Sequence, residues 1–318
     1  MTADETADPL ATSIAGAAAR IESARAKINL ALHVLRRRAD GYHSLDSLVV
    51  FAELADRLTA YRREETAVDL FLDGPFADGL AARIRLHDNL VFAAADALMQ
   101  AYPERINGGI RIDLAKVLPT AAGIGGGSAD AAATLRLLNR IWDLRLSTAQ
   151  LAEIGADLGA DVPVCVLSRP AQIEGIGDRV TPVPSIPAMP ILLVNPGVPV
   201  ATEEVFRRLA PAERSPLPPL PSFFASPMDL VLWLRGTRND LFEPACMVAP
   251  EALAAVRLVA SDPTCLFARM SGSGATVFGL FPTIEAASAA AERAQQARPT
   301  WWTAVTWTEA SPEIDDYG

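Results

Sequence analysis

The sequence LPTAAGIGGGSADAAATLRLLNRIWDL, residues Leu118–Leu144, passes from a proline through a glycine cluster into a run rich in alanine and leucine. Four glycines fall within five positions: Gly123, Gly125, Gly126 and Gly127. Glycine loses more conformational freedom on folding than any other residue, so the cluster is costly unless the backbone requires it. From Ala129 to Leu144, apolar residues recur at helical spacing, which predicts an amphipathic helix.

The residues in front of the glycines indicate a strand. Ile110, Ile112 and Leu114 alternate with charged residues, a period typical of a half-buried strand, which we expect to end near Pro119. A strand, a glycine loop and a helix start together predict an anion-binding site, because glycine lets N–H groups approach an anion and the helix start adds a positive dipole end. Ser128 can cap the helix or offer its hydroxyl to a phosphate. A purely structural turn is the alternative interpretation.

Two other nucleotide-binding motifs do not fit this stretch. A Walker A loop needs a Gly-Lys pair, and the chain contains none. A dinucleotide-binding fingerprint needs glycine or alanine where Ser128 stands and an acidic residue about 20 positions further on. Residues Leu144–Gln150 contain no carboxylate. A dehydrogenase is therefore the weakest interpretation.

Composition limits the class of protein. The chain has 318 residues and a net charge of −10, so it is long enough for more than one domain, and its charge disfavours nucleic acid and anionic membranes as partners. Its three cysteines lie far apart, which suits a reducing cytoplasm without disulfides. No apolar run reaches about 18 residues, so no transmembrane helix is expected. Only two of the 28 basic residues are lysine, Lys27 and Lys116.

The order of expected strands and helices, and the change in composition along the chain, predict an α+β protein of two domains. Residues 1–23 are expected to form a disordered tail, residues 24–168 an N-terminal domain and residues 169–318 a C-terminal domain, with the proline-rich segment Thr181–Pro190 as the connection. Ser147 and Gln150 predict a capping box for a helix that ends at Gly159. The other elements expected are strands at Arg25–Val34, Ser47–Leu54, Asp56–Tyr61, Ile191–Val194 and Ala275–Phe281, and helices at Asp88–Ala101 and Ile284–Arg298.

Five segments, in chain order, resemble motifs of the GHMP kinase superfamily, which includes galactokinase, homoserine kinase and mevalonate kinase. The quoted loop resembles its phosphate loop, and the other four segments are Ala26–Leu30 (AKINL), Arg37–His43 (RRADGYH), Leu158–Pro163 (LGADVP) and Arg269–Thr276 (RMSGSGAT). The glycine-rich form of the loop is most similar to the branch that phosphorylates the 2-hydroxyl of 4-diphosphocytidyl-2-C-methyl-D-erythritol in the non-mevalonate route to isoprenoid precursors. The chain departs from this pattern at three positions: Ala121, where the family usually has glycine, Ala129, where it usually has serine, and Val49, where many relatives have an aromatic residue.

The resemblance implies an ATP-dependent kinase with two domains and the active-site cleft between them. It implies that Mg²⁺ arrives with ATP, and no dedicated metal site is visible in the sequence. It also implies a set of ATP-binding positions: Asn89, Lys116, Pro119, Thr120, Ala121, Ala122, Gly123, Ile124, Gly125, Gly126, Gly127, Ser128 and Ala129. Asn89 can equally be a helix N-terminal residue.

Lys27 and Asp161 are the candidate catalytic pair. Asp161 lies between a helix and a proline-bounded apolar run, where we expect a buried carboxylate that needs a charged partner. Lys27 is the natural partner, and the resemblance implies the same pair. We expect Asp161 to accept the proton of the acceptor hydroxyl while Lys27 orients that hydroxyl. A structural ion pair is the alternative.

The resemblance also implies an acceptor that carries a cytidine diphosphate. Tyr42 and Phe206 match its two stacking faces and His43 its edge reader, whereas Asn29 and Thr202 match positions that hold polar groups of the substrate. A second glycine loop, Ser271–Gly274, is expected to pack beside the first and complete the cleft, with a structural turn as the alternative.

Two other functions stay open from the sequence. One is another GHMP kinase that acts on a homoserine-like or mevalonate-like alcohol, and the other is a nucleotide-binding regulator without turnover. Whichever GHMP kinase the chain is, we expect its partner to be a small molecule rather than nucleic acid or a membrane. We expect a cytoplasmic monomer or weak homodimer.

Overall fold

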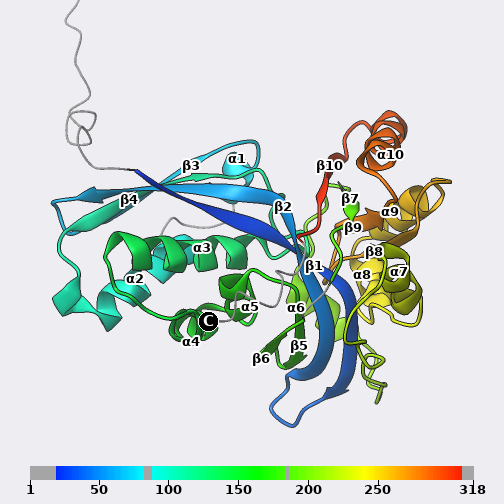
Figure 1. Cartoon of the computed structure of the whole chain (residues 1–318), viewed down its shortest axis with the longest axis horizontal. Helices are drawn as coiled ribbons and strands as arrows, with labels where there is room; N and C mark the ends of the chain where they lie inside the picture. Colours follow the sequence, from blue (N-terminus) through cyan, green and yellow to red (C-terminus); the bar gives the residue numbers. More distant parts are fainter. Residues whose placement is uncertain (1–18, 82–87, 184–185, 310–318) are drawn as a thin grey trace, which may run out of the picture.

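The computed structural model describes residues 19–81, 88–183 and 186–309 (Figure 1). Most of the tail expected over residues 1–23 lies outside the described residues. Its last residues do not, because the first strand begins at Arg20, and the tail prediction is therefore wrong for Arg20–Ser23. These residues pair with the second strand, where Arg20 lies opposite Ala60.

The first sheet is built on a long antiparallel hairpin of β1 and β2. Its strands are β1 (Arg20–Arg37), β2 (His43–Arg63), β3 (Val68–Asp73), β4 (Gly109–Ala115), β5 (Ala171–Gly175) and β6 (Arg179–Pro182). They run in the order β3-β4-β2-β5-β6, with β1 also paired to β2. The two strands expected at Ser47–Leu54 and Asp56–Tyr61 are one strand, because no glycine or proline interrupts them and different neighbours, β5 and β4, pair with the two ends.

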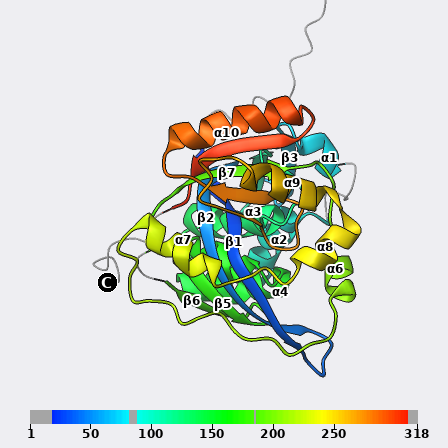
Figure 2. The same cartoon turned by 90° about the vertical axis from the view of Figure 1, so that its right-hand side faces the viewer.

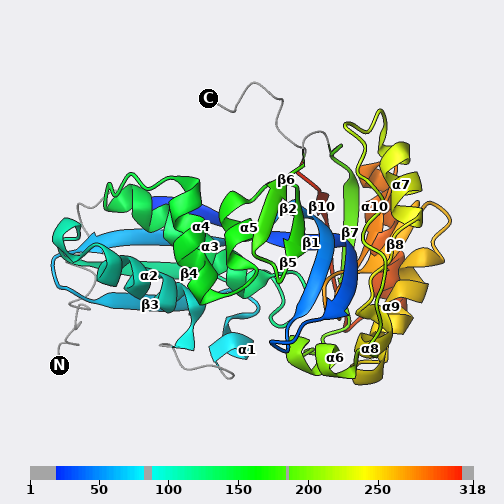
Figure 3. The same cartoon turned by 90° about the horizontal axis from the view of Figure 1, so that it is seen from below.

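Helices cover one face of this sheet (Figures 1 and 3). They are α2 (Leu90–Ala101), α3 (Gly126–Ile141), α4 (Thr148–Leu158) and α5 (Val162–Leu167). The short α1 (Ala77–Ala81) follows β3 and contacts it, and a 3-10 turn (Pro103–Arg105) follows α2. Helix α3 begins at Gly126, three residues before the predicted start, and its buried alanines pack against β1 and β2. The capping box of Ser147 and Gln150 is confirmed, as is the helix end at Gly159.

The second sheet has the order β10-β7-β9-β8. Its strands are β7 (Pro190–Asn195), β8 (Phe267–Met270), β9 (Val277–Leu280) and β10 (Trp302–Trp307), and its helices are α6 (Thr202–Arg208), α7 (Pro227–Arg235), α8 (Phe242–Val248), α9 (Glu251–Ala260) and α10 (Ile284–Ala297). Helix α10 runs alongside β10 and contacts β7 (Figure 2). One face of the sheet packs on α8, α9 and α10, and the other packs on the centre of the β1–β2 hairpin.

The hairpin therefore contributes to both halves of the molecule. Residues 24–34 of β1 are almost all buried, because helices cover one side of its centre and the second sheet covers the other. Strands β5 and β6 pair within the first sheet, although the sequence analysis placed their residues in the second domain. We keep the two-domain division as a proposal and move its boundary to the segment between β6 and β7. In the described part of the chain, no helix is long and apolar enough to cross a membrane.

Candidate active site

At two positions of the first glycine loop, closely packed neighbours and a positive φ favour glycine. Gly123 has a φ of 74°, and a Cβ there would lie 2.5 Å from the Ser271 carbonyl oxygen and 2.7 Å from the Gly274 nitrogen. Gly125 has a φ of 65° and caps α3, and a Cβ there would lie 3.2 Å from the Lys27 Cβ. A positive φ is costly for residues with a side chain, so both positions favour glycine on conformation as well as on space.

The second glycine loop packs against the first, as the sequence analysis expects. The Ser271 hydroxyl donates to the Gly123 carbonyl oxygen at 2.9 Å and accepts from the Asn29 backbone N–H at 3.1 Å. The Thr276 N–H donates to the Ala122 carbonyl oxygen at 3.1 Å. The loops are thus joined to each other and to β1. The SGSG pattern pointed to this loop, but nothing in the sequence showed that the Ser271 hydroxyl makes both contacts.

Lys27 and Asp161 form the expected ion pair beside the first loop. Lys27 lies on β1 and Asp161 directly precedes α5, and the Lys27 Nζ is 2.7 Å from Asp161 Oδ1. The lysine side chain is 4% exposed, whereas the aspartate side chain is 46% exposed. The prediction that Asp161 is buried is therefore wrong, because the carboxylate stands at the start of α5 and faces outward. An ammonium shielded by protein thus holds a carboxylate that an incoming hydroxyl can reach.

The Cys165 thiol, close to this ion pair, is a poor nucleophile at neutral pH. Cys165, on α5, is buried, and its burial raises the pKa of the thiol to about 12 even though the positive charge of Lys27 opposes that rise. A thiol at neutral pH is a poor nucleophile when its thiolate is so disfavoured. Cys165 is thus a packing residue behind the candidate site.

Lys116 lies in a buried cluster of charges beneath the first loop. Its side chain is 2% exposed, and its Nζ contacts Asp56 Oδ2 and, at 2.7 Å, Asp130 Oδ2. Asp56 also accepts the backbone N–H groups of Val117 and Leu118, at 2.6 and 2.9 Å. Lys116 was expected near the nucleotide, and its ammonium lies 3.6 Å from where a Cβ of Gly126 would stand. Its charge is close to the loop, but carboxylates enclose it.

Burial and the charges of the neighbouring groups together decide the protonation of this cluster. Burial raises the pKa of Asp130 to about 7, with the Lys116 charge opposing the rise and the Asp56 charge adding to it. Burial also lowers the pKa of Lys116, but the Asp130 and Asp56 carboxylates outweigh it and leave that pKa above its usual value. Lys116 therefore keeps its charge, and Asp130 is the member that can exchange a proton near neutral pH.

Asn89 is the N-cap of α2. Its side-chain oxygen accepts the Val91 N–H at 2.9 Å, and the residue is buried. This is the alternative that the sequence left open for it. Helix α2 begins next to α3, because a Cβ at Gly127 would lie 3.6 Å from a methyl group of Leu90. Asn89 is therefore close to the loop, and its contact with ATP stays a prediction.

Four of the five residues expected to hold the acceptor are linked by contacts through the second glycine loop and α6. From Asn29 the contacts pass through Ser271 to Ser273, whose hydroxyl lies 2.8 Å from that of Thr202 at the start of α6. Phe206 follows on the same helix. Its ring centroid is 5.2 Å from that of His43, with a tilt of 30°. Residues from four separate segments, β1, β2, α6 and the second glycine loop, are thus brought together.

Two of these residues have further properties that bear on binding. The Asn29 amide donates to Ser47 Oγ at 2.8 Å, while its Oδ1 is buried without a hydrogen-bond partner among the described residues. Burial lowers the pKa of His43, and the charges of Arg37 and Arg214 lower it further, so the imidazole is neutral at pH 7. A neutral imidazole offers one donor and one acceptor nitrogen.

Tyr42 does not join this group. It is 63% exposed and precedes the first residue of β2, and the ring packed against Phe206 is that of His43. Two stacking faces were expected, Tyr42 and Phe206. Of these two, Phe206 alone makes a ring contact among the described residues, with His43, and the role of Tyr42 stays a prediction.

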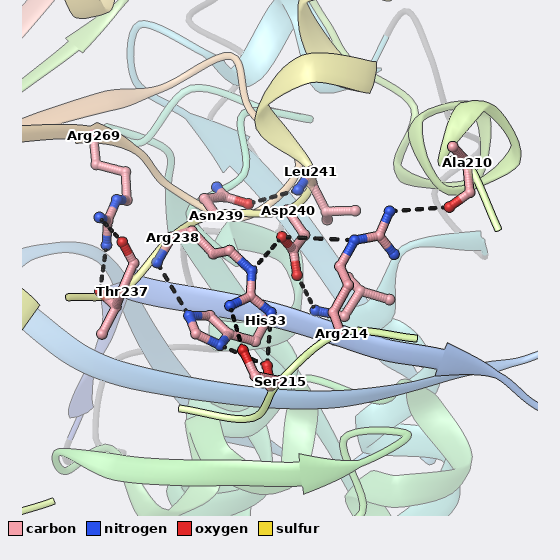
Figure 4. A network of polar contacts seen from close by, with 11 residues as sticks. His33, Ala210, Arg214, Ser215, Thr237, Arg238, Asn239, Asp240, Leu241 and Arg269 are labelled. Atoms are coloured by element: carbon pink, nitrogen blue, oxygen red, sulfur yellow. Dashed lines mark hydrogen bonds and ion pairs between the residues drawn. The ribbon is translucent and has the colours of Figure 1, made fainter. Parts of the chain in front are cut away.

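A network of polar contacts joins β1 to the segment between α7 and α8 and to the segment before α7 (Figure 4). Asn239 donates to the carbonyl oxygens of Met270 and Gly272 at 2.8 and 2.9 Å. His33 accepts the Arg238 N–H and contacts the Ser215 carbonyl oxygen, each at 3.1 Å, and burial lowers its pKa. Asn239 was not predicted from the sequence, because its partners lie more than thirty residues away and no pattern marks it.

No cluster of metal-ligating side chains accompanies these residues. Within residues 19–81, 88–183 and 186–309, no group of three or more histidine, cysteine, aspartate or glutamate side chains could hold a metal ion. All three cysteines are free.

Comparison with known proteins identifies the family. Residues 89–169 match the model of the GHMP kinases N-terminal domain, and residues 226–299 match that of the GHMP kinases C-terminal domain. A 4-diphosphocytidyl-2-C-methyl-D-erythritol kinase from Chelativorans sp. (strain BNC1) is 48% identical over 92% of this chain and 97% of its own length. One from Ruegeria pomeroyi is 50% identical over 88% and 96%.

A solved structure agrees with these relatives. The crystal structure of a 4-(cytidine 5'-diphospho)-2C-methyl-D-erythritol kinase superimposes with a TM-score of 0.73 and 32% identity, covering 91% of this chain and all of that one. Its fold is the two-part GHMP kinase fold, and the expected α+β class is confirmed. The chain belongs to the GHMP kinases and, among them, to the 4-diphosphocytidyl-2-C-methyl-D-erythritol kinase family.

Proposed function

We propose that this chain transfers the terminal phosphoryl group of ATP to the 2-hydroxyl of 4-diphosphocytidyl-2-C-methyl-D-erythritol. The observation that carries the proposal is the Lys27–Asp161 ion pair, 2.7 Å between charged atoms, against the glycine loop at the start of α3. Phosphoryl transfer requires positioning and charge stabilisation more than covalent chemistry. A loop for the phosphates and a carboxylate for the hydroxyl meet that requirement within one site.

The donor half of the site is the first glycine loop. Its N–H groups and the positive end of α3 bind the phosphates of ATP, and Ser128 is well placed to help, since its half-buried side chain has no hydrogen-bond partner among the described residues. Mg²⁺ comes with ATP as the MgATP substrate, held by phosphate oxygens, and when bound it neutralises part of their charge. Residues Pro119–Ala129 and Asn89 form this half, and Lys116 supports it from beneath.

In the acceptor half, Asp161 acts as general base. Its exposed carboxylate accepts the proton of the acceptor hydroxyl while the hydroxyl oxygen forms a bond to the terminal phosphorus of ATP. The bond from that phosphorus to the bridging oxygen breaks, and ADP leaves with the electron pair. Lys27 keeps Asp161 oriented and offers its ammonium to the same oxygen.

The cytidine end of the acceptor lies against α6. Phe206 supplies a stacking face, and the neutral His43 beside it supplies a donor and an acceptor for the edge of the base. Asn29, whose buried Oδ1 has no partner in the described part of the chain, and Thr202 hold polar groups between the cytidine end and the reacting hydroxyl. Tyr42 would cover the base from the exposed side. We also propose a cytoplasmic location, in keeping with three free cysteines, and a monomer or weak homodimer.

The decisive experiment is an ADP-release assay with purified protein and a panel of alcohols. The panel contains 4-diphosphocytidyl-2-C-methyl-D-erythritol, its analogue without the cytidine, homoserine and mevalonate. We expect turnover with the first compound and at most a trace with the others, because only the first fills both the hydroxyl site and the stacking site. Turnover with homoserine or mevalonate alone would contradict the acceptor, and ATP binding without any turnover would favour a regulator.

A further inference from the structure

A buried cluster of three charged side chains lies beneath the phosphate loop, and its two carboxylates have no role in the chemistry proposed above. The side chains of Asp56, Lys116 and Asp130 are 0%, 2% and 3% exposed. They come from β2, from the residue after β4 and from the second turn of α3. With both carboxylates ionised, the two negative charges exceed the one positive charge, and burial makes this uncompensated charge costly.

The two carboxylates are unequally supported. Asp56 uses both oxygens and accepts three donors, which are the Lys116 ammonium and two backbone N–H groups. Asp130 accepts only the Lys116 ammonium, through Oδ2, and its Oδ1 is buried without a partner among the described residues. Each hydrogen bond that a carboxylate accepts stabilises its ionised form. A proton that enters the cluster therefore binds Asp130, which accepts fewer hydrogen bonds, rather than Asp56.

The surroundings of Asp130 agree with this assignment. The charged and titratable groups that face it are Lys116, Asp56 and, from α5, the Cys165 thiol, which stays protonated. Among these, Lys116 is the single positive charge, and it is shared with Asp56. Burial correspondingly raises the pKa of Asp130 to about 7, so its protonation is balanced at neutral pH.

The cluster is next to the place where ATP phosphates would bind. The Lys116 Nζ lies 3.6 Å from the position of a Cβ on Gly126, the first residue of α3. Asp130 is four residues further along the same helix, on its buried side. Phosphates at the helix start bring negative charge to a cluster that already has an excess, and like charges favour the protonated form of a carboxylic acid.

We propose that Asp130 takes up a proton when ATP binds at the first glycine loop. The proton comes from solvent and neutralises Asp130, which leaves Asp56 and Lys116 as a neutral pair. The Asp130 carboxylate then no longer competes with the phosphates for the Lys116 ammonium. Asp130 is thus a positioning residue, which acts through Lys116 and does not touch the substrate. The inference rests on the proposed function, because it requires ATP at this loop.

The test is isothermal titration calorimetry of MgATP binding without an acceptor, at pH 7, in two buffers with different ionisation enthalpies. The buffer dependence of the heat counts the protons taken up. We expect the wild-type protein to take up about 0.4 proton per nucleotide more than Asp130→Asn. The wild-type Kd for MgATP should also rise about fivefold more than that of the variant between pH 6 and pH 8. Asp96→Asn, which removes an exposed carboxylate from α2, is the matched control and should behave as wild type.

A second measurement keeps the inference testable if Asp130→Asn does not fold. In wild-type protein labelled with ¹³C at aspartate carboxyls, the titration midpoint of Asp130 should move to higher pH when MgATP is added. Equal proton uptake by wild type and Asp130→Asn, or an unmoved midpoint with nucleotide bound, would overturn the inference and leave the proposed function intact. Absence of any MgATP binding heat would refute the proposed function and the inference together.

Discussion

The two lysines of the chain lie against neighbouring glycines of one loop and yet have opposite surroundings. Lys27 lies against Gly125 and pairs with a single carboxylate, Asp161, that is 46% exposed. Lys116 lies near Gly126 and pairs with two carboxylates that are 0% and 3% exposed. Both ammonium groups are themselves buried, so the difference lies in their partners.

This difference separates a group that can react from a group that can only support. A half-exposed carboxylate exchanges its contact with water for one with a substrate at little cost, whereas fully buried carboxylates have no route to a ligand. The Lys116 cluster instead joins β2, the start of the loop and α3 through hydrogen bonds. With the proposed function, the loop would have its chemistry on the Lys27 side and structural support on the Lys116 side.

The largest effect is expected from removing the exposed carboxylate. Asp161→Asn keeps the size of the side chain but cannot accept a proton, so kcat should fall by about 10²–10⁴-fold. The thermal midpoint should fall as well, because the buried Lys27 ammonium loses its charged partner, so kcat is compared at a temperature where the variant is folded. Steady-state kinetics and a thermal melt on the same sample measure both quantities.

Asp157→Asn, an exposed change on α4, is the matched control for Asp161→Asn and should leave both quantities as they are. A near-normal kcat in Asp161→Asn would mean that the Lys27 side is as structural as the Lys116 side, and the comparison would fail.

The next effect concerns stability and compares the lysines directly. Lys116→Met leaves two buried carboxylates without a counter-ion, which should cost about 3–5 kcal/mol of unfolding free energy. Lys27→Met leaves a carboxylate that water already reaches, so its cost should stay within about 1 kcal/mol. Urea titrations of the two variants measure the difference. Equal losses would show that exposure of the partner does not decide the role of the lysine.

The third effect tests whether the acceptor pocket at Phe206 belongs to the same site as the Lys27–Asp161 pair. Phe206→Ala removes the stacking face of the acceptor pocket, and base–aromatic stacking contributes about 1–3 kcal/mol. We expect the KM for the cytidine-bearing acceptor to rise about 10-fold or more, with the KM for ATP unchanged. Initial-rate kinetics with each substrate varied in turn separate the two. If both constants rise together, Phe206 supports the fold rather than the acceptor.

Local patterns in the sequence were enough to predict the parts of the site that depend on neighbours along the chain. The glycine cluster, the helix after it and the Ser147 cap follow from residues within one or two turns, and all are present. The pairing of Lys27 with Asp161 is a long-range contact, and it was predicted because the family motifs place both residues in the site.

Features set by the packing of distant segments were not predictable from these patterns. Asp56 is separated from Lys116 by sixty residues, and nothing near either residue marks the contact. The exposure of Asp161 depends on where α5 begins, and the single strand β2 depends on finding β4 and β5 as partners at its two ends. The pairing of His43 with Phe206 likewise depends on where α6 docks.

The smallest effect is expected within the loop that separates the two lysines. Ala121 has a φ of 51°, in the left-handed region, where a side chain costs about 1–2 kcal/mol. Ala121→Gly removes this strain but adds freedom to the unfolded chain, worth about 0.4–1 kcal/mol, so the net gain should be about 0.5 kcal/mol. Gly123→Ala is the contrasting variant. Its Cβ would meet the Ser271 carbonyl oxygen at 2.5 Å, and stability and ATP binding should both fall.

Urea titrations and MgATP binding of Ala121→Gly and Gly123→Ala measure this contrast. Both positions have positive φ, but only at Gly123 does the second glycine loop occupy the space of a side chain. A loss above about 1 kcal/mol in Ala121→Gly would show that the alanine methyl contributes packing at an exposed position. The expected result would instead show that contact with the second loop, rather than backbone conformation alone, determines where this loop needs glycine.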